Sequence, residues 1–186
     1  MIFTTRYRLL FYIISLWGLM MAPARAESTA QQAFSEYKIK AVYIYRLASF
    51  IRWEDNTQTT PTFCVIGRDS TTVTLEKLFA KSGQNTPLLT MNTLTEASEQ
   101  CDLLYVTNDK LQILQTLPQY PGLLTISDST DTLQVGGMIE LRTMGQQVKP
   151  VLSLSNIEKG NLSVSSQLMR IALVNDPKSN SVGGSR

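Results

Sequence analysis

The sequence contains no histidine and only two cysteines among its 186 residues. Without histidine there is no Ser-His or Cys-His nucleophile pair, no imidazole acid or base, and no His-ligated metal. Two lone cysteines also cannot supply a cysteine-only zinc site. We therefore expect neither an ordinary hydrolase nor a zinc enzyme, and we predict no catalytic residue, no metal and no cofactor.

The N-terminal residues have the order of an export signal. Arg6 and Arg8 lead into an apolar run over residues 9–21, and small residues follow up to Ala26. This order is typical of a secretory signal peptide. The alternative is a single membrane anchor, but about 13 apolar residues fall short of the roughly 20 that span a bilayer. We predict that residues 1–26 are a cleaved signal peptide.

Charge is scarce as well, at 17% of the residues. Removal of Arg6, Arg8 and Arg25 leaves 14 basic and 15 acidic residues, a formal charge of −1. No cluster of lysine and arginine remains. The sequence therefore predicts no binding of nucleic acid.

The remaining chain alternates between helical and extended patterns. A long amphipathic helix is predicted over 31–53, where the apolar residues recur at three- and four-residue steps: Phe34, Ile39, Val42, Tyr43, Leu47, Phe50 and Ile51. Extended runs over 62–67, 87–91, 103–107 and 123–127 are then separated by helical stretches over 72–80, 95–100 and 110–117. Apolar strands spaced by helices predict a largely parallel sheet with helices on both faces.

The pattern changes after Asp128. Residues 138–143 and 148–154 alternate with period two, which predicts an antiparallel hairpin at the sheet edge. Ser155 and Glu158 fit a capping box, and Gly160 could end that short helix in the left-handed conformation. A last helix is predicted over 166–174. The chain thus reads as one three-layer α/β domain over 27–174, followed by a disordered tail over 175–186.

Four segments carry a resemblance to a known family. Residues 40–53 read KAVYIYRLASFIRW, and they resemble the opening helix of the YfiR family of exported regulators, K-A-x-Y/F-x-Y-x-F-x-x-F-x-x-W. FCVIGRD at 63–69 and QCDLLYV at 100–106 are similar to that family's first and third strands. LTISD, GGMI and LSVSSQL, between 124 and 168, resemble its ending.

The resemblance implies a non-enzymatic periplasmic protein. Such a protein inhibits an inner-membrane diguanylate cyclase by binding its periplasmic sensor region, which lowers cyclic di-GMP and limits biofilm. An OmpA-like outer-membrane lipoprotein would sequester it and relieve the inhibition. The sequence is compatible with a homodimer. It is also compatible with a second hypothesis, a periplasmic module that senses a small molecule in the crevice at the strand ends.

The family carries a disulfide at the positions of Cys64 and Cys101. Cys64 lies early in the first of these strands and Cys101 just before the third, and the two strands are neighbours in a sheet of flavodoxin-like order. An exported protein also meets an oxidising compartment. The alternative is two buried, reduced cysteines that pack as small hydrophobic residues. A second cysteine pair found in some family members is absent here.

The opening helix supplies the candidate partner-binding residues Tyr43, Arg46, Phe50, Arg52 and Trp53. Tyrosine, tryptophan and arginine concentrate binding energy when they lose their water at an interface. Core packing of the aromatic stripe is the alternative. Arg46 stands where the family usually has Asn, as expected if the interface is adapted to its own cyclase.

Asp69, Asp109 and Asp128 each follow a predicted strand. Carboxylates at that edge of an open sheet could form a phosphoacceptor or Mg²⁺ site. Asp69 and Asp109, however, precede predicted helices, and Asp128 lies in a Ser-Asp-Ser turn. We therefore expect capping and turn roles for all three.

Overall fold

The computed structural model describes residues 27–54, 60–83 and 88–176. The predicted signal peptide and residues 177–186 lie outside them. The chain divides into two units, residues 1–34 and 35–186. Only the first turns of helix α2 (Glu27–Leu47) represent the first unit, and the second unit is the domain described below.

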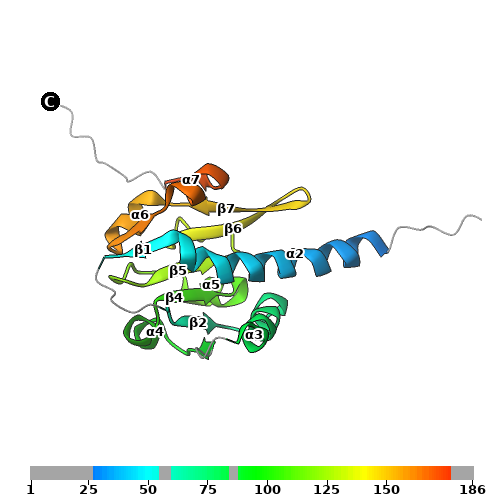
Figure 1. Cartoon of the computed structure of the whole chain (residues 1–186), viewed down its shortest axis with the longest axis horizontal. Coiled ribbons are helices and arrows are strands. Elements are labelled where there is room, and N and C mark those ends of the chain that lie inside the picture. Colours follow the sequence, from blue (N-terminus) through cyan, green and yellow to red (C-terminus); the bar gives the residue numbers. More distant parts are fainter. Residues whose placement is uncertain (1–26, 55–59, 84–87, 177–186) are drawn as a thin grey trace, which may run out of the picture. The chain divides into compact units, whose positions relative to one another are not determined.

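The elements of the domain follow the order that the sequence predicts, with three short strands and a 3-10 turn in addition. After α2 come a 3-10 turn (Ala48–Phe50), β1 (Ile51–Trp53), β2 (Phe63–Ile66), α3 (Ser70–Ser82), β3 (Leu89–Thr90), α4 (Leu94–Gln100), β4 (Leu103–Val106) and α5 (Asn108–Leu114). The second half contains β5 (Leu124–Ser127), β6 (Ile139–Met144), β7 (Gln147–Leu152), α6 (Leu154–Lys159), β8 (Leu162–Val164), α7 (Ser166–Ile171) and β9 (Leu173–Val174). Figure 1 shows this arrangement.

Seven strands form the main sheet, in the order β3-β2-β4-β5-β6-β7-β9. All neighbours are parallel except β6 and β7, which form the predicted antiparallel hairpin. The predicted fold class, a largely parallel α/β sheet with an antiparallel C-terminal hairpin, is therefore confirmed.

Two cores cover the two faces of the sheet, because successive residues of a strand point to opposite sides. Phe63 and Val65 of β2 join a core with α2, α3 and α7, whereas Cys64 and Ile66 join a second core with α4 and α5. The strand β4 divides its side chains in the same way, and Leu124 and Ile126 of β5 join the first core. This division gives the three layers.

Two predicted helix ends are wrong. Helix α2 ends at Leu47, and Ile51–Trp53 forms β1, which pairs antiparallel with β8 in a separate two-stranded sheet. The last helix ends at Ile171, and Leu173–Val174 adds to the sheet as β9. In both places the apolar pattern continues, but the chain exchanges helical hydrogen bonds for strand pairing with a distant segment.

The start and end of α6 also differ from the prediction. Ser153, not Ser155, caps this helix, because its side chain accepts a hydrogen bond from the Asn156 amide. Gly160 has a φ of −83°, and the left-handed residue is Asn161, with a φ of 55°. A Cβ at position 160 would lie 2.4 Å from Cε of Met138. A larger residue at this position would therefore require the end of the Met138 side chain to move.

Two residues that the sequence assigned to the tail are held by hydrogen bonds. The Asn175 amide donates to the Leu152 carbonyl at 2.9 Å. Asp176 Oδ1 accepts from the Ser155 amide at 3.0 Å and from the Ser153 hydroxyl at 3.0 Å. These bonds hold the chain as far as Asp176 against the end of β7 and the start of α6.

Candidate partner-binding groove

Helix α2 has two apolar faces, and the domain buries only one of them. Ala41, Ile44 and Leu47 are at most 1% exposed and face the core. Ile39 and Val42, which the sequence pattern assigned to the buried face, are 37% and 42% exposed. The assignment was wrong because apolar residues line both sides of the helix, so spacing alone does not identify the inner side.

A network of ion pairs and hydrogen bonds fixes the orientation of α2. Lys40, 8% exposed, places its Nζ 2.6 Å from Glu36 Oε1 and 2.8 Å from Asp128 Oδ2. The Thr143 hydroxyl donates to the same Glu36 oxygen at 2.6 Å. These contacts tie one helix to the loop after β5 and to β6, and they turn the Ile39 and Val42 side outward.

The charged forms of both Lys40 and Glu36 are favoured in this ion pair. Hydrogen bonds from Lys40 and Thr143 hold the pKa of Glu36 below its usual value. Burial lowers the pKa of Lys40, but the hydrogen bonds to Asp128 and Glu36 outweigh it, so the pKa of Lys40 rises. Both groups therefore stay ionised at neutral pH.

The small sheet of β1 and β8 brings α7 beside the end of α2. Ile51 pairs with Val164, and the Ser165 amide donates to the Phe50 carbonyl at 2.8 Å. The Ser165 side chain caps α7, and Leu168 of that helix is fully buried in the core shared with α2. Two helices more than a hundred residues apart in the sequence thus become neighbours.

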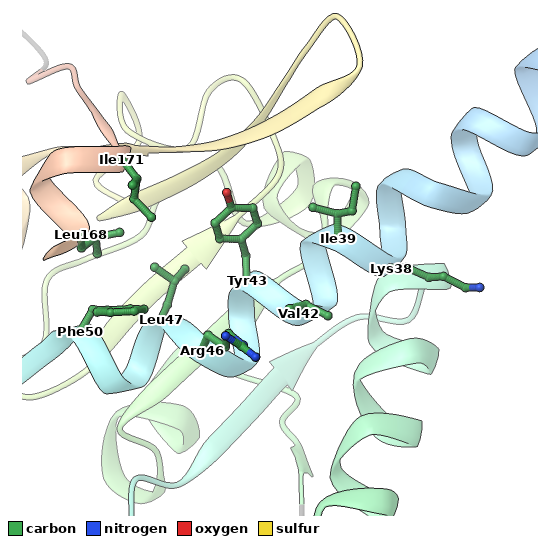
Figure 2. A pocket seen from close by; sticks show the side chains of 9 residues that line it. All are labelled: Lys38, Ile39, Val42, Tyr43, Arg46, Leu47, Phe50, Leu168 and Ile171. Carbon is green, nitrogen blue, oxygen red and sulfur yellow. The ribbon is translucent and has the colours of Figure 1, made fainter.

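Between α2 and α7 lies a groove with a volume of about 430 Å³. We call it the α2–α7 groove and define it by the residues that line it: Lys38, Ile39, Val42, Tyr43, Arg46, Leu47, Phe50, Leu168 and Ile171. In Figure 2, Leu168 and Ile171 point from α7 towards α2, and Tyr43 points from α2 towards α7. Arg46 and Lys38 lie along the outer side of α2 (Figure 2).

Exposed apolar residues concentrate around this groove. Eight large hydrophobic residues of the described chain are exposed, and six of them lie on two short segments: Ile39 and Val42 of α2, and Met169, Ile171, Leu173 and Val174 of α7 and β9. Of these six, Ile39, Val42 and Ile171 line the groove. Exposed apolar residues gathered at one site mark an interaction surface more often than scattered single residues do.

The candidate residues from the sequence divide into two groups. Tyr43, Arg46 and Phe50 line the groove, whereas Arg52 and Trp53 do not. Arg52 is exposed on β1, and Trp53 donates its indole N–H to the Gly122 carbonyl at 2.8 Å. That hydrogen bond gives Trp53 a structural role.

Sequence reasoning missed Leu168 and Ile171, and it misplaced Ile39 and Val42. For α2 the signal was present, since one helix carried more apolar positions than a single buried face needs. For α7 no local signal existed, because its position depends on the pairing of β1 with β8.

The three aspartates after the strands lie at two helix starts and in an ion pair. Asp69 caps α3 in a capping box with Thr72, and Asp109 lies in the first turn of α5. Asp128 pairs with Lys40. Within the described ranges, no three His, Cys, Asp or Glu side chains come close enough to hold a metal ion.

Tyr105 lies among these carboxylates. Its hydroxyl donates to Asp69 Oδ2 at 3.2 Å. Burial raises the pKa of Tyr105, and the charges of Asp128 and Asp69 raise it further. The phenol therefore stays protonated and acts as a hydrogen-bond donor.

Cys64 and Cys101 form a disulfide, with their Cα atoms 5.9 Å apart. The bond joins the second residue of β2 to the end of α4 and lies in the core on the face opposite the groove. A disulfide fits an oxidising compartment. None of the helices in the part of the chain that the structure describes is long and apolar enough to cross a membrane.

The YfiR/HmsC-like family model matches residues 37–173, which is nearly the whole domain. The chain belongs to the YfiR/HmsC-like family. Its members have a regulatory, periplasmic role. The match begins just before the groove-lining part of α2 and ends after α7, so both walls of the α2–α7 groove belong to the family domain.

Comparisons with solved structures give only distant likenesses. One, described as the ABC domain in complex with L-Trp from Streptococcus pneumoniae, has a TM-score of 0.49 at 10% identity and aligns with 75% of this chain. Another, a conserved domain protein from Vibrio cholerae, has a TM-score of 0.48 at 9% identity and aligns with 74%. The chain spans 60% and 59% of the lengths of those two structures. No curated protein matches this chain.

Proposed function

We propose that this protein represses an inner-membrane diguanylate cyclase by binding the cyclase's periplasmic sensor region through the α2–α7 groove. The observation that carries the proposal is the uncovered apolar face of α2, which lies on the segment that resembles the opening motif of the YfiR family. Family membership supports the regulatory role, and the groove offers the surface through which that role can be exercised.

Repression of this kind needs differential affinity and no catalytic group. A repressor that binds the inactive state of the cyclase more tightly shifts the population towards that state. Moving an equilibrium from 1:99 to 99:1 needs roughly a 10⁴-fold preference, or about 5.5 kcal/mol. Burial of a few apolar side chains at about 25 cal/mol per Å² can supply that difference.

Relief of repression then follows from competition. An OmpA-like outer-membrane lipoprotein that binds the same protein lowers the free concentration available to the cyclase. The cyclase returns to its active state as the repressor is withdrawn.

The open form of the groove favours a protein partner over a small molecule. Small-molecule sites usually bury about 70–90% or more of their ligand. Here the wall residues Ile39, Val42 and Ile171 are 37–53% exposed, and the groove opens to solvent along α2. A small ligand would remain partly in water, whereas a protein surface would cover the whole patch.

Deletion of the gene tests the proposal in cells. The deletion strain should contain more cyclic di-GMP and form more biofilm, because the cyclase is released. A second deletion that removes the target cyclase should restore the low level. An unchanged cyclic di-GMP level, under conditions in which the protein is normally made, would contradict the proposal.

Complementation with surface variants tests the groove. Val42→Asp should fail to restore repression, because a charge on the apolar wall weakens binding by about 2 kcal/mol, or about 30-fold in affinity. Since Val42 is exposed, the substitution should change the protein's free energy of unfolding by about 0.5 kcal/mol or less. Ile113→Asp is the matched control, because Ile113 is 73% exposed on α5, the helix on the opposite face of the sheet.

A further inference from the structure

A second hollow lies on the face of the sheet opposite the α2–α7 groove. It has a volume of about 280 Å³ and lies between α5 and the connection from β5 to β6. We call it the α5 pocket and define it by the residues that line it: Leu111, Gln112, Gln115, Ser129, Asp131, Gln134 and Val135. Leu111 and Val135 pack in the core on the α4 and α5 side of the sheet, which places the pocket on that side.

One wall of the α5 pocket is a crossover without a helix. Parallel neighbours in a sheet are usually joined by a crossover helix. The connection from β5 to its parallel neighbour β6 consists instead of bends and turns over residues 128–138. In one of these turns the amides of Gln134 and Val135 donate to the Asp131 carbonyl at 3.0 and 3.1 Å. The polar residues of this connection thus lie beside α5, where they line the pocket.

The polar side chains of the pocket have hydrogen-bonding capacity that the described chain does not use. Gln112, Gln115, Asp131 and Gln134 are exposed, and their side chains make no hydrogen bond or ion pair with any residue that the structure describes. Each glutamine amide offers N–H donors and a carbonyl oxygen, whereas the Asp131 carboxylate only accepts. Leu111, 2% exposed, adds an apolar surface between them.

Gln115 keeps a side chain at a backbone position that favours glycine. It ends α5 in the left-handed conformation, with a φ of 59°. Glycine adopts this conformation without the steric cost of a Cβ atom and is the usual residue at such a helix end. The glutamine side chain therefore gives the backbone no advantage over glycine, which favours a role for it in the pocket.

The groups that line the pocket select a class of ligand. Asp131 is the one charged residue of the lining, so an anion would meet a like charge and no cation. An ammonium group could pair with Asp131, but it only donates, and the glutamine N–H groups would have no acceptor. Hydroxyl groups both donate and accept, so they match amides and carboxylate alike. The volume lies just below the roughly 300–1,000 Å³ of drug-sized pockets, which suits a compact ligand.

We propose that the α5 pocket binds a compact, neutral, hydroxyl-rich molecule, namely a sugar, either free or as one unit of a glycan. The amides of Gln112, Gln115 and Gln134 donate to its hydroxyl oxygens, and Asp131 accepts from its hydroxyl groups. This inference goes beyond the proposed function and does not depend on it, because the pocket and the groove lie on opposite faces of the sheet.

A titration followed by nuclear magnetic resonance tests the site. Glucose, galactose or N-acetylglucosamine is added, up to about 10 mM, to isotope-labelled protein purified from the cell envelope, which detects dissociation constants near 1 mM. At least one of these sugars should shift the side-chain amide signals of Gln112, Gln115 and Gln134 in a saturable way. Inorganic phosphate and putrescine, which represent an anion and a diamine, should leave these signals unchanged.

Gln115→Gly separates binding from folding. The variant removes one amide from the pocket, but glycine suits the backbone there. Affinity for the sugar should therefore fall about tenfold, while the melting temperature stays the same or rises. Gln112→Ala should also weaken binding. Its matched control is Gln100→Ala, because Gln100 is exposed on α4 and lies outside the pocket, and this variant should change the affinity by less than twofold.

The other results would overturn the proposal, and none of them involves the cyclase. No saturable shift with any of the three sugars, or a shift with putrescine alone, would exclude a sugar as the ligand. Unchanged affinity of both Gln115→Gly and Gln112→Ala would place the sugar site elsewhere. A trisaccharide of the bound sugar distinguishes the two sources: tighter binding than that of the single sugar indicates a glycan, and equal or weaker binding indicates the free sugar.

Discussion

Lys40 is the residue whose environment departs furthest from what its type suggests. A lysine in a helix normally points to solvent, yet Lys40 is buried between Glu36 and Asp128, and the second oxygen of Asp128 is buried with no hydrogen-bond partner in the described chain. The sequence pattern predicts a turn role for Asp128 and no ion pair for Lys40. Its partner lies 88 residues away, so local spacing holds no sign of the pair.

Replacement of Lys40 by methionine tests this ion pair. Lys40→Met should lower the free energy of unfolding by about 2–4 kcal/mol, because removal of one partner leaves a largely buried carboxylate without compensation. Lys77→Met, at an exposed position of α3, is the control and should change stability by about 0.5 kcal/mol or less. Urea unfolding at neutral pH measures both. Equal stability of the two variants would show that Asp128 finds another partner or becomes protonated.

At the scale of elements, the sequence predicts what local pattern determines. The parallel strands and the helices between them follow from apolar runs and their spacing, and the hairpin of β6 and β7 follows from alternation across a short turn. The pairing of β1 with β8 joins two three-residue segments about 110 residues apart. Strands that short carry no reliable local signal, so the wall of the groove that depends on them was not predictable.

The disulfide between Cys64 and Cys101 acts on two elements, because it fixes the end of α4 to β2. It closes a sequence separation of 37 residues, which corresponds to about 4 kcal/mol in the chain-entropy account. The double variant Cys64→Ser and Cys101→Ser should therefore lose about 2–5 kcal/mol of stability. Denaturant unfolding of the variant and of wild type with and without reductant measures the effect.

Comparing the variant with oxidised and with reduced wild type shows whether the loss of stability comes from the missing cross-link or from altered packing. If the bond itself stabilises the domain, reduced wild type should resemble the variant. If reduced wild type is stable and the variant is not, the loss of stability comes from the buried serines instead. The groove lies on the other face of the sheet, so neither protein should change its partner affinity while it remains folded.

For the whole molecule, the pH dependence of stability should be set in part by Asp176. Hydrogen bonds from the amide and hydroxyl of Ser155 and from Ser153 lower the pKa of Asp176 below its usual value. A carboxyl group with a lowered folded pKa contributes stability above its unfolded pKa. That contribution is lost as the pH falls through the folded pKa.

Asp176→Asn tests this contribution. At pH 7 the variant should melt at a lower temperature than wild type, and the difference should shrink as the pH is lowered below about 4, the unfolded pKa of aspartate. Thermal melts across this pH range give the comparison. The same difference at pH 7 and at pH 3 would mean that the variant acts through packing at the start of α6 and not through charge.

The fold class of the whole molecule was predictable because many weak local signals agreed, whereas the groove was only half predictable. Tyr43, Arg46 and Phe50 could be chosen from the sequence, since their residue types are those of interfaces. The orientation of the helix that carries them depends on Lys40, and the opposite wall depends on β1 and β8. Both are long-range contacts, which a reading of neighbouring residues does not reveal.

The two walls of the α2–α7 groove come from the first and the last helices of the domain. A chain shortened by proteolysis before Ser166 would keep β2 to β6 and the disulfide but would have no α7, and therefore no groove. Under the proposed function, cleavage at the C-terminal end would end repression without removing the protein from the cell envelope. A protease that acts near residue 165 would then be an irreversible activator of the proposed target cyclase, and an antibody against the central sheet would still detect the inactive fragment.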